Sequence, residues 1–186
     1  MPDSQRLSPD TDAELLLSAD AVAQGIQRLA EQVQPVVDKG NCLLIGVLTG
    51  GMFPLVHLAE LLQGDFLIDY CHATRYSGGT EGGEMCWERT PGFSLEGQDV
   101  VVVDDIYDAG ETLAEVAKFC RANGAASVRT AVLVIKDRDR AAATPLPDFD
   151  AGLIVPDRYV FGCGMDVHNR WRHLTAIYAL ADTGRS

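Results

Sequence analysis

The chain has 186 residues, of which 47% are apolar and 23% charged, a length and composition typical of one globular domain. Its formal net charge of −12 argues against a nucleic-acid partner, because nucleic-acid affinity rests mainly on phosphate neutralisation. The longest apolar runs, 42–48 and 100–103, are far shorter than the roughly 20 residues of a membrane-spanning helix, so we expect no membrane partner. A small anionic substrate stays possible if a few cations gather locally.

The N-terminal segment and the cysteines favour a cytoplasmic protein. Residues 1–12 are polar and lack the apolar centre of a signal peptide, so we expect a frayed end. The five cysteines include no C-x-x-C pair, which indicates free thiols in a reducing compartment. The four histidines do not have the spacing of zinc ligands.

The first predicted element is an amphipathic helix. Apolar residues recur every three or four positions from Val22 to Val37, with charged residues and glutamines between them. Ser18 or Asp20 can cap its start. Pro35 is expected to kink or end the helix, and Gly40-Asn41 closes it.

A strand, a tight loop and a second helix are expected next. Residues 42–48 form a continuous apolar run, Thr49-Gly50-Gly51 supplies the loop, and residues 53–62 have a helical pattern. A second strand is expected over 65–71. Residues 75–91 are rich in glycine and polar side chains, which predicts a long exposed loop or loose hairpin.

The second half of the chain repeats this alternation. Strands are predicted at 100–103 and 128–135 with a helix at 112–122 between them, and shorter strand-like pieces follow at 151–155, 159–161 and 175–180. Strands that alternate with helices predict an α/β fold whose parallel sheet is covered on both faces. Ligands bind such sheets beyond the carboxyl ends of the strands. The two most unusual loops of the chain, Thr49-Gly50-Gly51 and residues 104–112, both follow the carboxyl ends of apolar strands.

The loop after the apolar run 100–103 carries the clearest chemical signal. Asp104 and Asp105 place two adjacent carboxylates at a strand end, where they can hold ribose hydroxyls or a hard cation such as magnesium. Gly110 then makes a turn, and Thr112 opens a helix whose first N–H groups form an anion site. A nucleotide-sugar site is favoured. A phospho-acceptor domain of the response-regulator type and simple helix capping stay open as alternatives.

This loop resembles the signature of the type I phosphoribosyltransferases, which bind phosphoribosyl pyrophosphate. The shared pattern is an apolar run, two acids, two apolar residues, an acid, a small residue, glycine, any residue and threonine. In this chain Ala109 stands where threonine is usual, which removes one hydroxyl contact to a 5′-phosphate. The resemblance implies a central, mostly parallel sheet flanked by helices, with a small hood lobe from the N- and C-terminal segments.

Over residues 20–180 the chain resembles the hypoxanthine-guanine phosphoribosyltransferases in particular. That resemblance implies a single domain over 1–186, with a core at about 40–140, a hood from about 1–39 and 150–186, and a mobile lid at about 75–91. The lid would include Arg75, Tyr76 and Ser77, and its glycines supply hinge freedom.

The resemblance assigns a role to each end of the substrate. It implies that Thr49 and Gly50 bind pyrophosphate together with Arg172, and that the peptide Leu48–Thr49 is cis, although relatives often have lysine in place of Thr49. The ribose and 5′-phosphate would be bound by a set drawn from one loop: Asp104, Asp105, Asp108, Ala109, Gly110, Glu111 and Thr112. Glu111 departs from the lysine or leucine of relatives.

The resemblance also assigns the purine site and the metal. Lys136 would donate to the exocyclic oxygen of a 6-oxopurine, Tyr159 would stack on the base, and Val160 would supply backbone contacts. Asp166 would face the base and, with Asp104 and Asp105, hold magnesium. A catalytic Asp108 would accept the purine proton.

The implied reaction is purine salvage, in which hypoxanthine or guanine displaces pyrophosphate and gives IMP or GMP. The implied state is a cytoplasmic homodimer or homotetramer. A xanthine-preferring enzyme and a nucleotide-binding regulatory protein of the same fold remain alternatives. Adenine lacks the oxygen that Lys136 would contact, so it should be a poor substrate.

Overall fold

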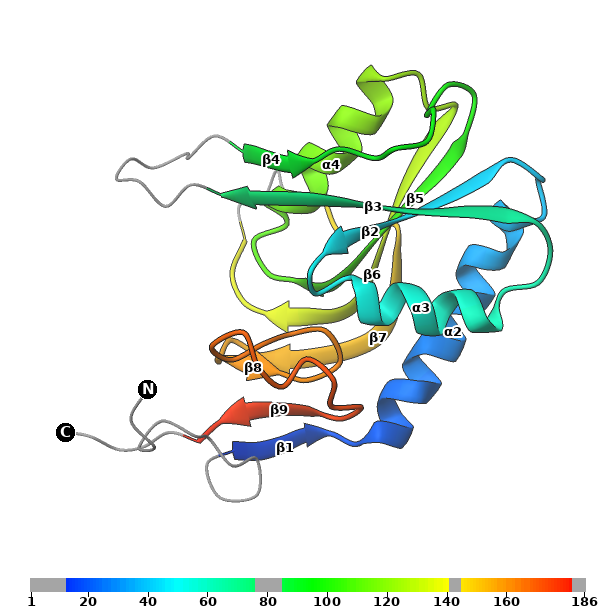
Figure 1. Cartoon of the computed structure of the whole chain (residues 1–186). Helices are drawn as coiled ribbons and strands as arrows, with labels where there is room; N and C mark the ends of the chain where they lie inside the picture. Colours follow the sequence, from blue (N-terminus) through cyan, green and yellow to red (C-terminus); the bar gives the residue numbers. More distant parts are fainter. Residues whose placement is uncertain (1–12, 76–84, 141–144, 182–186) are drawn as a thin grey trace.

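The computed structural model describes residues 13–75, 85–140 and 145–181 and contains two sheets (Figure 1). The larger sheet has the order β4-β3-β2-β5-β6-β7. Its strands are β2 (Cys42–Leu48), β3 (Phe66–Arg75), β4 (Met85–Arg89), β5 (Asp99–Tyr107), β6 (Ser127–Asp137) and β7 (Phe149–Pro156). The smaller sheet, of order β1-β9-β8, contains β1 (Ala13–Leu17), β8 (Val160–Phe161) and β9 (Ile177–Leu180). The helices are α2 (Ala19–Val37), α3 (Met52–Leu61) and α4 (Glu111–Ala122).

The larger sheet is mostly parallel, which confirms the predicted α/β class. Strands β3, β2, β5, β6 and β7 pair in parallel, and only β4 at the edge is antiparallel to its neighbour. The carboxyl ends of β2, β5 and β6 therefore meet at one edge of the sheet. This is the edge at which α/β sheets bind ligands.

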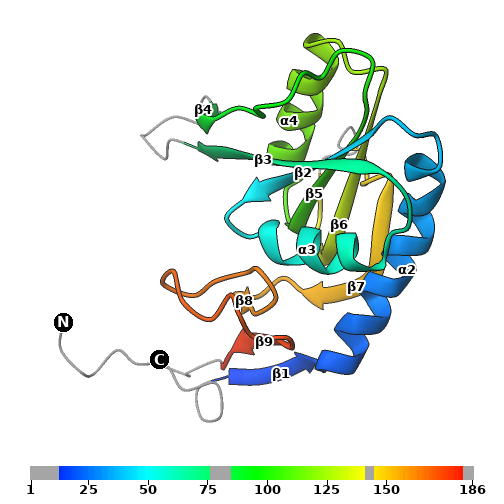
Figure 2. The ribbon, with the colours of Figure 1, turned by 45° about the vertical axis from the view of Figure 1, so that its right-hand side comes forward.

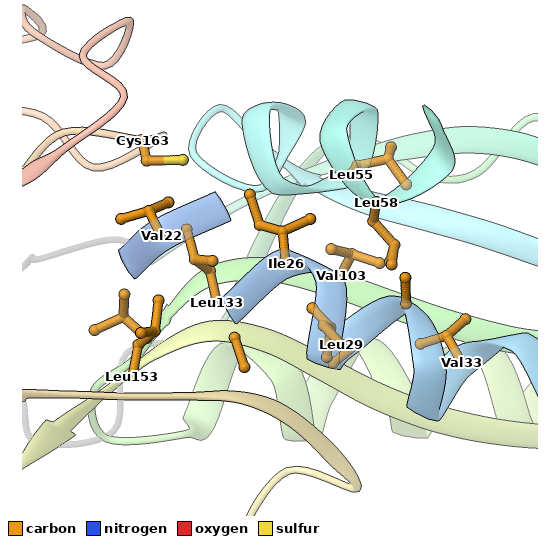
Figure 3. Packing of buried hydrophobic residues seen from close by; sticks show 14 of the residues in the cluster. Val22, Ile26, Leu29, Val33, Leu55, Leu58, Val103, Leu133, Leu153 and Cys163 are labelled. Carbon is orange, nitrogen blue, oxygen red and sulfur yellow. The ribbon is translucent and has the colours of Figure 1, made fainter. Parts of the chain in front are cut away.

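The core has two layers, because alternate residues of each central strand face opposite sides of the sheet. On one face, α2 and α3 cover strand residues that include Leu44, Val103 and Leu133. Figure 3 shows this cluster, with side chains of α2 packed between α3 and the strands. On the other face, α4 covers a second set that includes Leu43 and Val102. Burial on both faces explains why these strands read as continuous apolar runs.

Helix α2 forms where its apolar periodicity predicts, and Ser18 caps it by accepting a hydrogen bond from the N–H of Ala21 at 3.2 Å. Pro35 does not end the helix, which continues for two more residues to Val37. A Cβ at Gly25 would lie 2.7 Å from Leu153 of β7, so α2 packs closely on the large sheet. None of the helices in the described ranges is long and apolar enough to cross a membrane.

The small sheet differs from the expected hood in its limits. Strand β1 was not predicted, because it gains its order only by antiparallel pairing with the distant β9. Strand β7 lies in the expected hood range but pairs with β6 in the large sheet, and α2 packs against β7. In Figures 1 and 2, α2 leads from the small sheet back along the large one. The expected fraying of residues 1–12 lies outside the described residues.

Candidate active site

Strand β5 runs four residues further than its apolar run predicts, so Asp104 and Asp105 lie within the strand rather than in the loop after it. The side chain of Asp105 is buried, and the N–H of Asp105 donates to Asp104 Oδ1 at 2.9 Å. Burial raises the pKa of both carboxyls, and for Asp104 the charge of its neighbour raises the pKa further. Burial therefore disfavours the charged form of this pair, which bound hydroxyls or a cation would stabilise.

The loop after β2 lies directly against Asp105. A Cβ at Gly50 would lie 1.8 Å from Asp105 Oδ2, and a Cβ at Gly164 would lie 2.3 Å from the carbonyl oxygen of Gly50. No side chain fits at either glycine, so the backbone of three distant segments converges on one carboxylate. The peptide Leu48–Thr49 is cis, as the family resemblance implies.

Three residues further along the chain, Asp108 has the opposite electrostatic setting. Its Oδ2 accepts a hydrogen bond from Lys136 Nζ at 3.0 Å, and its Oδ1 is bound by the guanidinium of Arg138. Asp157 lies 3.6 Å from Lys136 Nζ and 3.9 Å from Arg138 Nε. Partial burial alone would raise the pKa of Asp108, but the hydrogen bonds and charges of Lys136 and Arg138 outweigh it and hold the pKa below its ordinary value.

Arg140 connects the ends of β5 and β6 through hydrogen bonds to the backbone of both. Its guanidinium donates to the backbone oxygens of Asp108 at 2.7 Å and of Tyr107 at 3.1 Å, and it also binds the carbonyl oxygen of Lys136. The same group lies 5.0 Å from the centre of the Tyr107 ring. One side chain thus fixes the backbone of both residues that form the Asp108–Lys136 ion pair.

The turn after Asp108 opens α4 and lines a cavity of about 330 Å³. Gly110 has a positive φ of 79°, and a Cβ there would lie 2.3 Å from the hydroxyl oxygen of Tyr107. Glycine is therefore required at this turn. The cavity is lined by residues 104–113 and Arg138. The first N–H groups of α4 point out of its start, which makes the turn suitable for an anion.

The segment between β8 and β9 lies over the Gly50 loop and carries Arg172. The guanidinium of Arg172 binds Asp166 Oδ1 at 2.6 Å and donates to the carbonyl oxygen of Gly164 at 2.6 Å. The positive charge of Arg172 also lowers the pKa of Asp105, which burial raises. A cavity of about 480 Å³ lies beside it, lined by Thr49, Met52, Phe53 and residues 169–173. Arg172 thus lies at the cavity that Thr49, just after β2, helps to line.

Comparison with known proteins settles the family of this chain. Residues 12–167, more than half of the chain, match the family model described as "Phosphoribosyl transferase domain".

The chain belongs to the phosphoribosyltransferase family.

Curated and solved relatives agree. A hypoxanthine-guanine-xanthine phosphoribosyltransferase of Tritrichomonas foetus is 30% identical over 91% of this chain and 92% of its own. A hypoxanthine-guanine phosphoribosyltransferase of Staphylococcus epidermidis is 30% identical over 84% of this chain and 89% of its own. A solved hypoxanthine-guanine-xanthine phosphoribosyltransferase superposes with a TM-score of 0.82 at 27% identity, covering 93% and 99% of the two chains.

The expected residues of this phosphoribosyltransferase fall into three groups at the sheet edge. Asp104 and Asp105 lie beside the Gly50 loop, Asp108 and Lys136 form an ion pair, and Tyr159 is 55% exposed just before β8. The remaining expected residues lie next to these groups: Ala109, Gly110, Glu111 and Thr112 line the turn into α4, and Val160 is buried in β8. Arg75 ends β3, and Tyr76 and Ser77 lie outside the described residues.

The expected set of three magnesium ligands is not gathered in one place. In the described ranges, no three histidine, cysteine, aspartate or glutamate side chains are arranged to hold a metal ion. Asp166 is instead engaged by Arg172, and its other oxygen accepts the N–H of Asn169 at 2.7 Å. Asp166 is thus paired with Arg172, and Asp108 is paired with Lys136. Among the described residues, neither Asp104 nor Asp105 has a cationic side chain at hydrogen-bond distance.

Sequence reasoning missed three charged residues of this phosphoribosyltransferase site, namely Arg138, Arg140 and Asp157. They lie in or after the charged segment 137–150, which has no periodicity and was interpreted as a connection. The contacts of Arg138 to Asp108 and of Arg140 to Tyr107 join residues 30 or more positions apart, and Asp157 pairs with Lys136 and Arg138 about 20 positions before it. The only local signal was the run Lys136-Asp137-Arg138-Asp139-Arg140 directly after a buried strand, the position at which ligand-binding residues of α/β sheets occur.

Proposed function

We propose that this phosphoribosyltransferase serves purine salvage by transferring the 5-phosphoribosyl group of phosphoribosyl pyrophosphate to hypoxanthine or guanine. The products are IMP or GMP and pyrophosphate. The observation that carries the proposal is the contact of 3.0 Å between Asp108 and Lys136 at the ends of adjacent strands. It presents a proton acceptor and a cation side by side, as a 6-oxopurine with its ring N–H and neighbouring carbonyl requires. The relatives at 30% identity support the same reaction.

The loop of β5 suits the ribose phosphate. Asp104 and Asp105 would accept hydrogen bonds from the two ribose hydroxyls, which would offset the cost of holding both carboxyls ionised. The turn at Gly110 would bind the 5′-phosphate through N–H groups at the start of α4. Ala109 offers a backbone donor but no hydroxyl there.

The other side of the site suits pyrophosphate. Thr49 and Gly50 offer backbone groups next to Asp105, and Arg172 faces them with a planar guanidinium that suits phosphate oxygens. Because Arg172 is engaged by Asp166, pyrophosphate would take the place of that carboxylate. Stabilising the charge of the departing group is the electrostatic part of the catalysis.

The residues present also fit magnesium. Magnesium prefers one or two carboxylates together with phosphate oxygens and water, rather than a cage made by the protein alone. Asp104 and Asp105 provide two adjacent carboxylates whose pKa values are raised by burial, so a bound cation would favour their charged forms. A bound magnesium ion would neutralise charge on pyrophosphate. Asp166 would join the ligands only after release from Arg172.

The chemistry of the base side follows from three residues. Asp108 would accept the proton of the imidazole N–H beside the carbonyl (N7) as the other imidazole nitrogen (N9) bonds to the anomeric carbon and the bond from this carbon to pyrophosphate breaks. Lys136 would donate to the exocyclic oxygen, and the exposed ring of Tyr159 would stack on the base. The buried Val160 would hold its backbone toward the base. A lid over the described edge would exclude water.

Incubation with magnesium, phosphoribosyl pyrophosphate and each of hypoxanthine, guanine, xanthine and adenine tests the proposal. We expect IMP and GMP and little AMP, because adenine offers no oxygen to Lys136. Xanthine is the second candidate base, because the Tritrichomonas foetus relative includes it in its name. Tight binding of a nucleotide without turnover of any base would overturn the enzyme and favour a regulatory protein of the same fold.

We further propose that the chain acts in the cytoplasm as a homodimer or homotetramer. Five free cysteine thiols fit a reducing compartment. Exposed large apolar side chains on the consecutive elements α3 and β3 fit a subunit interface, among them Met52, Val56, Leu61, Leu67 and Ile68. Light scattering should give a mass of two or four chains, and Leu67→Glu should lower it. A monomeric mass for the unchanged chain would contradict the assembly.

A further inference from the structure

The cavity at the turn into α4 has an unusual balance of charge. Of the described residues that line it, four are acidic, namely Asp104, Asp105, Asp108 and Glu111, and Arg138 alone is basic. A phosphate group that enters this cavity meets mainly negative side chains. Backbone N–H groups supply only partial charges. Arg138 therefore brings the one full positive charge that this lining can offer to a phosphate.

The position and the chemistry of Arg138 both suit phosphate binding. Its side chain is 38% exposed, so it can change partners without leaving a buried charge behind. It binds one oxygen of Asp108, which lies two residues before Gly110 in the same turn. A planar guanidinium binds phosphate through two parallel hydrogen bonds. Lys136 is less suited, because its side chain is only 13% exposed and it does not line this cavity.

We propose that Arg138 binds the 5′-phosphate of the substrate and leaves Asp108 when it does so. The inference rests on the function proposed above and adds a binding residue to it. Lys136 keeps its hold on Asp108 Oδ2 at 3.0 Å, so the carboxylate stays in place. Release of Arg138 frees Oδ1, the oxygen that then accepts the purine proton. Binding of the phosphate thereby frees Asp108 to act as the proton acceptor. The contact from Arg138 also compensates for the hydroxyl that is missing at Ala109.

Ligands that differ only in the phosphate give the most direct test. The dissociation constants of GMP and guanosine are measured by calorimetry, with weak guanosine binding measured by displacement, for the unchanged chain and for Arg138→Gln. We expect the variant to bind GMP about 10- to 100-fold more weakly, the effect of one charge-assisted hydrogen bond, and to bind guanosine unchanged. Arg138→Lys keeps the charge without the planar fork and should fall between the two.

Arg129→Gln is the matched control. Arg129 lies on the same strand β6, has a 53% exposed side chain and pairs with Asp148 at 3.2 Å, but does not line the cavity. It should bind both ligands like the unchanged chain. Circular dichroism checks that each variant is folded.

Equal weakening of GMP and guanosine in Arg138→Gln, or no change in either, would overturn the inference. The assay with four bases separates this failure from that of the proposed function. If the unchanged chain makes GMP while Arg138→Gln still binds GMP normally, only the role of Arg138 is wrong. If the unchanged chain makes no nucleotide from any base, the proposed function itself fails.

Discussion

Two groups of acids at the carboxyl end of β5 differ in their surroundings and in their pKa. Asp104 and Asp105 are held at the end of β5 with raised pKa values, because burial opposes their charge. Three residues further on, Asp108 has a lowered pKa, because hydrogen bonds from Lys136 and Arg138 outweigh its partial burial. The sequence shows three similar carboxylates, and they are separated by burial and by the partners of Asp108, namely Lys136 of β6 and Arg138 just after it.

The difference indicates what each group needs from a ligand. The first group lacks positive charge and gains stability from a cation or from hydroxyl donors. The second group is already paired and must give up a partner before it can accept a proton. The following predictions test this contrast, from the largest expected effect to the smallest.

Removing the paired carboxylate should have the largest effect. Asp108→Asn keeps the shape but cannot accept the purine proton, so kcat should fall by about 10²- to 10⁴-fold, the range for general acid–base catalysis. Asp157→Asn, which removes the other acid near Lys136 and Arg138, should cost less than about 10-fold on the same scale. Steady-state kinetics compare the two. Near-normal turnover of Asp108→Asn would remove it as the base.

Arg172→Ala should have the second largest effect. It removes a donor to pyrophosphate and the cation that lowers the pKa of Asp105. We expect the KM for phosphoribosyl pyrophosphate to rise about 10- to 100-fold, and the KM for the base to change much less. An equal rise in both values would show that Arg172 supports the whole site rather than one substrate.

A third buried acid extends the comparison to stability. Asp69 accepts hydrogen bonds from the N–H groups of Tyr70, Gly92 and Phe93 at 2.6–2.9 Å. Burial opposes its charge, but these donors and Arg89 outweigh it and lower its pKa. Asp69→Ala should therefore reduce the free energy of unfolding by about 1–3 kcal/mol at pH 7.

The pH dependence gives this prediction its sign. A carboxyl whose pKa is lower in the folded state contributes stability that is fully present above its unfolded pKa of about 3.9 and is lost as the pH falls through the folded pKa. Urea unfolding of the unchanged chain and of Asp69→Ala at pH 7 and toward pH 3 measures it. The difference in the free energy of unfolding between the unchanged chain and Asp69→Ala should narrow at low pH. A difference that widens would contradict the lowered pKa of Asp69.

Neutralising one member of the unpaired group should stabilise the protein slightly. A raised pKa means that the folded state binds more protons than the unfolded state between the two pKa values, so stability falls as pH rises through that window. Asp104→Asn removes the cost of charging this buried carboxyl. The melting temperature at pH 7 should rise by about 2–4 °C for each kcal/mol gained in the free energy of unfolding. The variant should lose activity and any stabilisation by magnesium. A lower melting temperature would show that Asp104 is not under electrostatic strain.

The elements that form this contrast were predictable to different degrees. The loop from Asp104 to Thr112 was found because its strand, acids, glycine and helix start are consecutive in the sequence, so local spacing carries the signal. Arg138 and Arg140 were not found, because their partners lie about 30 residues away and a charged segment has no periodicity. The sequence thus located the acids together with Lys136 and Arg172, but not Arg138, which also lowers the pKa of Asp108.

The small sheet was the least predictable part of the fold. Strand β1 pairs only with β9, from the far end of the described chain, and neither segment has a clean alternation of apolar and polar residues. The segment before β9 holds His168, Asn169 and Trp171 at positive φ, a conformation that sequence patterns do not indicate for residues other than glycine. Arg172 follows this segment, so its position depends on tertiary packing.

Phosphorus NMR of a reaction with magnesium, phosphoribosyl pyrophosphate and hypoxanthine tests the central claim most directly. The account predicts that pyrophosphate and IMP appear together in equal amounts, and that neither appears when hypoxanthine is left out. Pyrophosphate released without IMP, or a substrate signal that does not change while hypoxanthine is present, would contradict it.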